Sequence, residues 1–251
     1  MPDAYTTFRK LHEGGCFVLP NPWDVGSARR LAVKGFKALA STSAGTAWAL
    51  GKQDGEITLD ECLAHLRMLC TATDLPVNAD FESGFADSSE GVATSVARAM
   101  ETGVAGLSIE DRVGKTLYPI EAGVERIRAA RTAIDRTEPR ALLVGRTEGF
   151  LVGRDDLAEV IRRLKAYSDA GADVLYAPGL RTLDQVAEVV AAVAPKPVNV
   201  LLGFVDASVS ELAATGARRL STGAALAAAA WKGLEKAADT LIESGRLPPR
   251  G

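Results

Sequence analysis

The amino-acid sequence predicts an α/β fold, a (β/α)8 barrel that forms a single domain over residues 1–251. Eight short runs rich in Val, Ile, Leu and Ala alternate with eight segments whose apolar residues recur at helical spacing. Continuous apolar strands that alternate with helices are typical of a parallel sheet covered by helices. Apolar residues make up 47% of the 251 residues, and eight such units in a chain of this length fit a closed barrel better than an open sheet.

The predicted elements follow one another at short intervals. The strands lie at residues 16–20, 37–42, 76–81, 106–111, 141–147, 172–178, 197–202 and 218–222. The helices lie at residues 25–35, 58–73, 88–103, 121–134, 155–171, 182–193, 208–216 and 223–245. Several helices begin with an N-cap signature and an acid in the first turn, as in Thr58 to Glu61, and several end at a glycine such as Gly103. The sequence therefore predicts no linker and no second domain.

The charge balance argues against nucleic acid as a partner. The 29 Lys and Arg residues oppose 32 Asp and Glu residues, which gives a net charge of -3 and no broad basic surface. No uninterrupted apolar run reaches the roughly 18 residues that a membrane span needs, and the N-terminus lacks the apolar region of a signal peptide. We therefore expect a soluble, cytoplasmic protein without a membrane partner. Three cysteines without a CxxC motif predict neither a disulfide framework nor a zinc site.

Acidic side chains follow several of the predicted strands. The active site of such a barrel is built at the carboxyl ends of its strands, where Asp80, Glu82 and Glu110 lie. With Asp54 they would converge on one mouth that has Arg146 as its main counter-charge, and packed carboxylates repel one another unless a cation is present. Taken alone, Asp54 is equally well explained as a turn residue. Their shared position favours Mg²⁺, with Mn²⁺ as a substitute, because the available donors are all oxygens.

Small and basic residues complete the predicted mouth. Thr42, Ser43 and Ala44 form a run that leaves backbone N–H groups free to face an anion, although any loop between strand and helix can be small. Arg146 follows an apolar run, and its guanidinium matches carboxylate or phosphate bidentately. Asp111 is more simply explained as a loop salt-bridge partner than as a ligand. Neither histidine lies at a predicted strand end, so no Ser–His or Cys–His nucleophile can be assembled there.

A series of ordered motifs runs through the chain. They are NPWDVGSA, GFKALASTSAG, Asp54 followed by TLDE, DFESGF, SIED, GRTE and ADVLYAPG. On these motifs the chain resembles the isocitrate lyase / phosphoenolpyruvate mutase superfamily over nearly its whole length. The resemblance implies a barrel enzyme that acts on α-oxycarboxylates and makes or breaks C–C or C–P bonds next to an enolate or a keto group.

The resemblance also implies roles for site residues. Three acids would hold the metal. Asp80 is the direct ligand, and Glu82 and Glu110 act through water. Five residues would bind the substrate. Thr42, Ser43 and Ala44 bind its carboxylate, Arg146 contacts its anionic end, and Trp23 lies near the same pocket. Asp54 matches an acid at the edge of metal and substrate. The seventh predicted strand adds Asn199 as a further candidate for substrate binding.

Residues 111–121 depart from the superfamily pattern. The lyases that cleave isocitrate or methylisocitrate carry a K-K-C-G-H loop there, whereas this segment has neither Cys nor His. Lys115, Tyr118 or a metal-bound water are the candidate general acids. The leading hypothesis is a Mg²⁺-dependent lyase that cleaves a C–C bond in a small 2-oxo or 2-hydroxy carboxylate, such as oxaloacetate. Phosphonopyruvate-type C–P chemistry and a catalytically silent metabolite-binding barrel are the alternatives.

The last predicted helix is rich in alanine, and small side chains allow close packing between helices. The resemblance suggests that this helix is exchanged between the subunits of a homodimer or homotetramer. An ordinary eighth helix that packs on its own barrel is the alternative.

Overall fold

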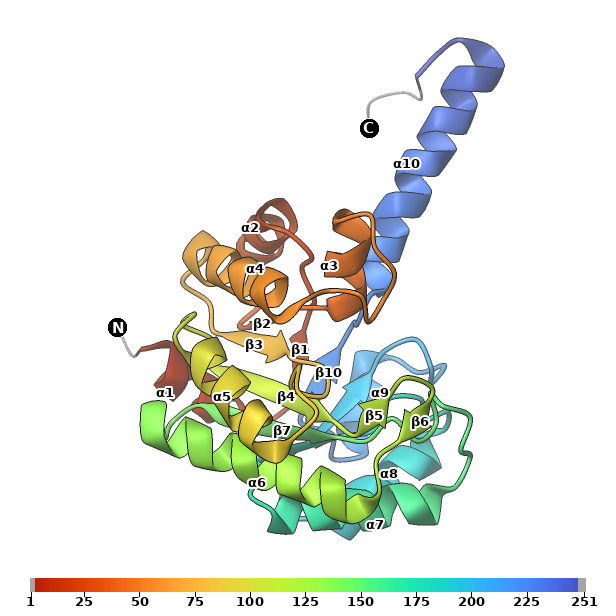
Figure 1. Cartoon of the computed structure of the whole chain (residues 1–251). Coiled ribbons are helices and arrows are strands. Elements are labelled where there is room, and N and C mark those ends of the chain that lie inside the picture. Colours follow the sequence, from red (N-terminus) through yellow and green to blue (C-terminus); the bar gives the residue numbers. More distant parts are fainter. Residues whose placement is uncertain (1–2, 248–251) are drawn as a thin grey trace.

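A computed structural model describes residues 3–247 and shows a barrel of parallel strands (Figure 1). The strands are β1 (Phe17–Leu19), β2 (Leu39–Ala40), β3 (Val77–Asp80), β4 (Gly106–Glu110), β7 (Leu142–Arg146), β8 (Val174–Tyr176), β9 (Val198–Leu201) and β10 (Arg219–Ser221). They are paired in the order β1-β10-β9-β8-β7-β4-β3-β2. Between the two ends of this order, the Ala40 backbone N–H donates to the Pro20 carbonyl at 3.1 Å. The predicted (β/α)8 fold is thus confirmed.

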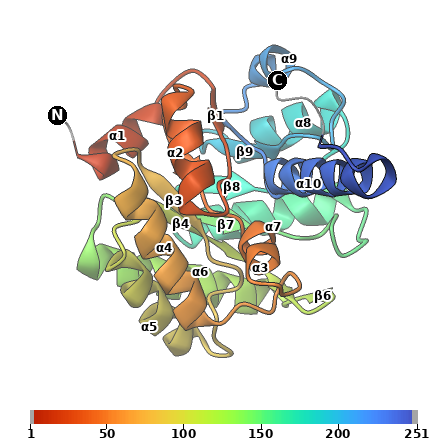
Figure 2. The same cartoon turned by 90° about the horizontal axis from the view of Figure 1, so that it is seen from above.

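Helices surround the strands when the barrel is seen from above (Figure 2). They are α2 (Val25–Val33), α4 (Leu59–Ala72), α5 (Ser89–Met100), α6 (Ile120–Thr137), α7 (Leu157–Asp169), α8 (Leu183–Val193) and α9 (Val209–Ala214), followed by α10 (Ala225–Ser244). Each coincides with a predicted helical segment. At the start of α4 the Thr58 hydroxyl accepts from the Glu61 N–H, and the Glu61 carboxylate accepts from the Thr58 N–H. This capping box confirms the sequence signature at that helix start.

Three short elements are absent from the sequence prediction. They are α1 (Ala4–Leu11), α3 (Ser43–Ala49) and the antiparallel hairpin of β5 (Arg112–Val113) with β6 (Thr116–Leu117). Helices of one or two turns have too few apolar residues to show a clear period. In α3 the run of small residues hides the helix, whose first turn is capped by the Thr42 hydroxyl.

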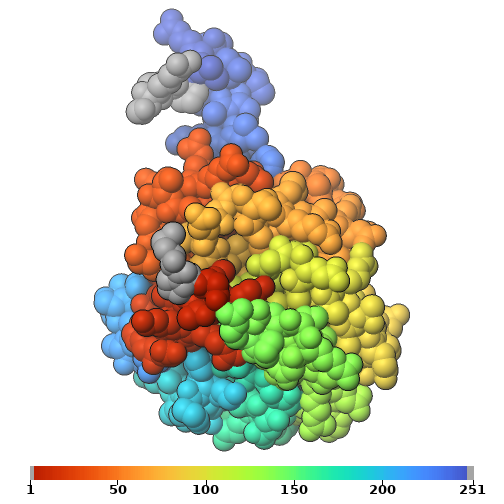
Figure 3. Space-filling model, turned by 90° about the vertical axis from the view of Figure 1, so that its left-hand side faces the viewer, coloured from red at the N-terminus to blue at the C-terminus, as the bar shows by residue number. Residues whose placement is uncertain are grey.

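Helix α1 closes the barrel at the end where the strands begin. Its Phe8 is fully buried and belongs to the apolar cluster of the barrel interior, together with Leu19, Val144 and Val174. His12, the C-cap of this helix, lies edge-on to Phe8 and to Phe17 of β1, with ring centroids 4.8 and 5.0 Å apart. In Figure 3 the red atoms of the N-terminal segment that contains α1 lie near the middle of this face of the molecule. The pocket described below therefore opens only toward the other end of the strands.

Helix α10 leaves the barrel instead of packing along it (Figure 1). Ala227 is its one buried residue among those described, while Leu234 is 58% and Ile242 82% exposed. The alternative of an ordinary eighth barrel helix is therefore wrong. Within residues 3–247, none of the helices combines the length and the apolar character that a membrane crossing requires.

Phe8→Ala tests the closure of the barrel by α1. Loss of a fully buried phenyl ring should lower the free energy of unfolding by about 3–5 kcal/mol, measured by urea denaturation. Lys10→Ala, at an exposed position of the same helix, should change it by less than about 0.5 kcal/mol. Equal effects of the two substitutions would contradict the placement of Phe8.

Candidate active site

A small polar pocket opens at the carboxyl ends of the barrel strands. Its volume is about 140 Å³, well below the roughly 300 Å³ at which pockets for drug-sized ligands begin. Polar side chains from most of the strands line it, and they are Asn21, Ser41, Thr42, Ser43, Asp54, Asn78, Asp80, Ser108, Arg146, Tyr176, Asn199, Arg219 and Ser221. The pocket therefore suits a small polar metabolite.

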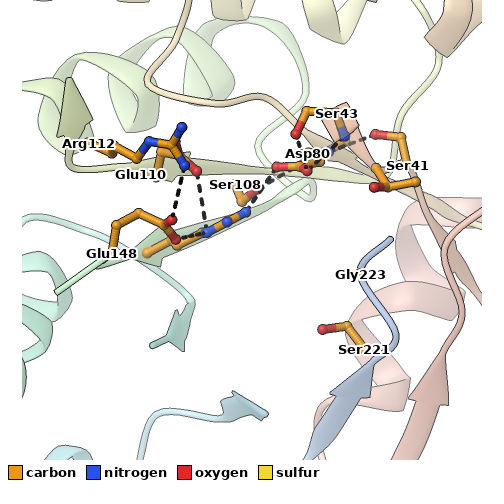
Figure 4. Close-up of polar contacts among 12 residues, drawn as sticks. Ser41, Ser43, Asp80, Ser108, Glu110, Arg112, Glu148, Ser221 and Gly223 are labelled. Atoms are coloured by element: carbon orange, nitrogen blue, oxygen red, sulfur yellow. Dashed lines mark hydrogen bonds and ion pairs between the residues drawn. The ribbon is translucent and has the colours of Figure 1, made fainter. Parts of the chain in front are cut away.

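Arg146, at the end of β7, is the centre of an ion-pair cluster. Its three carboxylate partners, Asp80, Glu110 and Glu148, are labelled in Figure 4. Its Nη1 lies 3.1 Å from Asp80 Oδ1, and its Nε lies 3.3 Å from Glu110 Oε2 and 2.5 Å from Glu148 Oε1. The sheet register explains part of this arrangement, because Glu110 and Arg146 are paired neighbours on β4 and β7. Burial opposes the charge of Arg146, but the three carboxylates raise its pKa well above the ordinary value. The guanidinium is therefore already compensated by protein groups.

Asp80 is fixed at the wall of the pocket by its hydrogen bonds. Its Oδ2 accepts from the backbone N–H and from the hydroxyl of Ser43, each at 3.0 Å. Its own N–H donates to Ser41 Oγ at 2.8 Å. Asp54 lies close by, with Oδ1 3.3 Å from Ser43 Oγ. The structure thus brings together Asp80 at the end of β3, the start of α3 and the exposed Asp54.

Two acids of this site carry a buried oxygen without a hydrogen-bond partner among the described residues. These atoms are Glu82 Oε1 and Glu148 Oε2. Burial, aided by the charges of Asp80 and Asp54, raises the pKa of Glu82 to about 7. Glu82 also has φ at +46°, a left-handed conformation that costs a non-glycine residue of the order of 1 kcal/mol or more. Strain and unpaired oxygens at one place indicate a functional site.

The residues present fit a hard divalent cation by the chemistry of their donors. The acids of the cluster supply only oxygen, and they are Asp80, Glu82, Glu110 and Glu148. Burial and the neighbouring carboxylates raise the pKa of Glu110 well above its ordinary value although Arg146 opposes the shift. Within residues 3–247, no three Asp, Glu, His or Cys side chains converge closely enough to hold one ion. Because Mg²⁺ commonly takes one or two protein carboxylates and keeps several waters, such a cage is not required.

The predicted run of small residues lines the pocket but is not an open anion-binding loop. Thr42 is the N-cap of α3, and its hydroxyl accepts from the Gly45 N–H at 3.3 Å. The Ser43 N–H is already donated to Asp80. The expectation of free N–H groups from Thr42 to Ala44 is therefore wrong for Ser43. A helix start consumes these groups because capping and the Asp80 carboxylate satisfy them.

Three predicted site residues lie away from the pocket. Trp23 lines a neighbouring, largely apolar cavity of about 470 Å³ that also contacts His65. Lys115 is exposed at the turn of the β5–β6 hairpin. The Tyr118 hydroxyl accepts from Arg126 Nη2 at 3.0 Å, and the same guanidinium lies 4.1 Å from the centre of its ring. The structure thus brings neither candidate acid of residues 111–121 to the pocket.

Asn199 lines the pocket, but its side chain is engaged with protein groups. Its Nδ2 donates to Ser221 Oγ and its Oδ1 accepts from Arg219 Nε, both at 2.9 Å. Tyr176 and Arg219 also line the pocket, and Arg219 is a site residue that sequence reasoning missed. The alternation of inward side chains along a strand was the available signal, because Arg219 and Ser221 occupy the same face of β10.

Asp111 has the structural role that the sequence favours. Its carboxylate is buried and accepts from the Thr147 hydroxyl, the Glu148 N–H and Arg163 Nη1, at 2.8, 2.9 and 3.1 Å. The Tyr167 hydroxyl donates to the same group at 2.6 Å. These bonds fix the segment that carries Glu148 against β4 and α7, so Asp111 supports the cluster from behind.

Comparison with known proteins identifies the family. The family model described as Phosphoenolpyruvate phosphomutase matches residues 8–242. The chain belongs to this family. A Burkholderia cenocepacia J2315 protein, whose lyase/mutase assignment is itself provisional, superposes with a TM-score of 0.93 at 46% identity over 97% of this chain and 89% of that chain.

Two relatives with named activities extend this result. A 2,3-dimethylmalate lyase, a member of the PEP mutase/isocitrate lyase superfamily, superposes with a TM-score of 0.90 at 30% identity over 100% of this chain and 91% of that chain. The oxaloacetate decarboxylase of Pseudomonas putida (strain GB-1) is 30% identical over 198 residues, 74% of this chain and 66% of that protein. The resemblance found in the sequence is confirmed, and this phosphoenolpyruvate mutase-family chain is an enzyme of the carbon–carbon lyase type.

Glu82→Gln tests the charge state of the cluster in metal-free protein of this family. In the folded state the pKa of Glu82 is raised from 4.5 to about 7, so its ionisation costs stability that increases as pH rises through this window. Relative to wild type, Glu82→Gln should raise the free energy of unfolding by about 2–3 kcal/mol at pH above 7 and change it little near pH 4.5. Urea unfolding with a chelator present measures both.

Asp87→Asn is the matched control, because Asp87 is an exposed acid of the same loop. It should show no comparable gain at either pH. A gain for Glu82→Gln that does not depend on pH would contradict the raised pKa.

Proposed function

We propose that this enzyme is a Mg²⁺-dependent lyase, with Mn²⁺ as a substitute, that cleaves a C–C bond in a small 2-oxo or 2-hydroxy carboxylate. Oxaloacetate is the leading candidate, and the reaction is then a decarboxylation. The observation that carries the proposal is the excess of carboxylates around Asp80 at the wall of a pocket of about 140 Å³. The names of the relatives, which include an oxaloacetate decarboxylase and a 2,3-dimethylmalate lyase, support it.

The carboxylates would hold the ion in two ways. Asp80 would bind it directly, and Glu82 and Glu110 would act through water, since magnesium commonly accepts few direct carboxylates. Once bound, the ion supplies Lewis-acid stabilisation of the enolate that forms when the C–C bond breaks. Asp54, at the rim, would face the same region. Ionisation of Glu82 and Glu110, costly without a cation, becomes favourable beside one.

The remaining pocket residues would bind and orient the substrate. Ser43 and Ala44 line the pocket with small side chains, so the substrate carboxylate can approach the start of α3 closely. Arg146 is paired with Asp80, Glu110 and Glu148, so it would position these carboxylates beside the substrate.

Tyr176 is the proton donor that we favour over Lys115 and Tyr118. In decarboxylation the electron pair of the broken bond stays on the enolate, carbon dioxide leaves, and a proton must reach the carbon. Burial raises the pKa of Tyr176 to about 12, so its phenol stays protonated at neutral pH. The Arg146 guanidinium lies 5.2 Å from the ring centre and would stabilise the phenolate after transfer.

A substrate panel tests the proposed function. With Mg²⁺ present, purified enzyme should release pyruvate from oxaloacetate or cleave alkylmalates, and Asp80→Ala should lower kcat/KM by at least about a thousandfold, because the ion loses its direct ligand. Asp87→Ala is the control and should keep full activity. Phosphate release from phosphonopyruvate without C–C cleavage would replace the proposal with C–P chemistry, and oxalate binding without any turnover would indicate a silent barrel.

We also propose that α10 is exchanged between subunits of a homodimer or homotetramer. The exposed apolar residues of the helix support this, and they are Trp231, Leu234, Leu241 and Ile242. A cavity of about 510 Å³ lies at the base of the helix between Trp48 and Trp231. Exposed apolar surface of this kind is typical of a surface that another chain covers.

A double substitution in α10 tests the assembly. Leu234→Glu with Ile242→Glu places charges on the apolar face, and we expect the oligomer to dissociate to monomers in light scattering coupled to gel filtration. Lys236→Glu, exposed on the same helix, should leave the mass unchanged. A monomeric wild-type protein would contradict the exchange.

A further inference from the structure

Arg219 is a buried cation that no carboxylate compensates among residues 3–247. It is 3% exposed, at the first position of β10. Its Nε donates to Asn199 Oδ1 at 2.9 Å and its Nη1 to Asn78 Oδ1 at 3.4 Å, so its described partners are two neutral amides. An uncompensated buried charge is costly, which makes a charged partner from outside the chain the simplest explanation.

The other buried arginines are satisfied in different ways. Arg146 contacts three carboxylates, and Arg163 contacts Asp111 and Glu159. Arg126 donates to three backbone carbonyls and to one phenol oxygen. Of these arginines, Arg146 and Arg219 line the pocket, and Arg219 is the one without a carboxylate partner among the described residues.

The groups that face Arg219 from other elements are neutral. His12, the C-cap of α1, has its pKa lowered to about 3 by burial and by the charge of Arg219, so its imidazole is neutral at neutral pH. Tyr176 of β8 stays protonated, and β3 and β9 contribute Asn78 and Asn199. Burial lowers the pKa of Arg219 to about 10, which leaves it charged. The pocket therefore has one wall that is rich in carboxylates and one free cation.

The sheet separates these two parts of the pocket. Strand β10 lies three strands from β7 through β9 and β8, and three strands from β3 through β1 and β2. Arg219 and Ser221 share the inner face of β10, and Arg219 lies deeper because it comes first along the strand. A molecule in the pocket can therefore contact Asp80 with one end and Arg219 with the other.

We propose that Arg219, oriented by Asn199 and Asn78, binds the second carboxylate of a dicarboxylate substrate at the floor of the pocket. This rests on the proposed function only for the identity of the other end, the 2-oxo or 2-hydroxy carboxylate. The preferred substrates of the enzyme are then short dicarboxylates and not monocarboxylates. Arg146 lies on the carboxylate-rich wall, where Asp80, Glu110 and Glu148 already offset its charge.

Malate and lactate form the probe pair, because both are 2-hydroxy acids and they differ in the second carboxylate. Calorimetric titrations with and without Mg²⁺ should show that wild type binds malate at least about tenfold more tightly than lactate, since a charge-assisted hydrogen bond contributes roughly ten- to hundredfold. Arg219→Gln should weaken malate binding by roughly ten- to hundredfold and lactate binding by less than about threefold. Arg219→Lys should retain part of the preference.

Arg218→Gln is the matched control, because Arg218 lies next in sequence and donates to the Gly15 carbonyl outside the pocket. It should leave both affinities unchanged, and circular dichroism should show that all variants are folded. The inference is overturned if wild type does not prefer malate, or if Arg219→Gln weakens both ligands equally or neither. A separate measurement tests the proposed function: it fails if wild type does not bind oxalate in the presence of Mg²⁺. The malate and lactate affinities measured without Mg²⁺ test the role of Arg219 independently of that result.

Discussion

The pairing of Arg146 with Asp80, Glu110 and Glu148 is the interaction on which the candidate site depends. It joins three neighbouring strands, β3, β4 and β7, at the end of the barrel where the pocket opens. Removal of one charged partner from such a cluster is strongly destabilising, because it leaves the other charges buried and unpaired. The cluster contains more acidic than basic side chains, so a further positive charge is needed to balance it. Local structure and binding chemistry are therefore consequences of the same arrangement.

The opposite wall of the pocket shows the complementary imbalance. Arg219 lacks a carboxylate, while Glu82 and Glu148 each hold a buried oxygen without a hydrogen-bond partner among the described residues. Both imbalances cost folding free energy, and proteins keep such costs where a ligand offsets them. A dicarboxylate that binds a divalent cation at one end and offers a free carboxylate at the other matches both walls. The electrostatics of the pocket thus select orientation as well as binding.

The sequence was informative wherever a repeating pattern or a strand end defined position. Eight apolar runs were enough to predict the barrel, and the rule that active sites lie at strand ends placed Asp80, Glu110 and Arg146 together. It failed where position depends on side-chain direction. Tyr118 belongs to the expected loop, yet its hydroxyl is paired with Arg126, away from the pocket. Ser43 was expected to offer a free N–H, but the start of an unrecognised helix and a carboxylate from another strand consume it.

The same distinction explains why Arg219 on the barrel wall was missed. It lies within a strand sequence, where a polar residue gives no sign of whether it faces inward until the register is known. Once the register is fixed, a wall residue is held by its strand and by packing on both sides, whereas a loop residue must be ordered at a cost in conformational entropy. If the proton donor is Tyr176, the short β5–β6 hairpin no longer needs to deliver an acid to the pocket. The absence of Cys and His from residues 111–121 then marks a transfer of this role to the barrel, not a loss of chemistry.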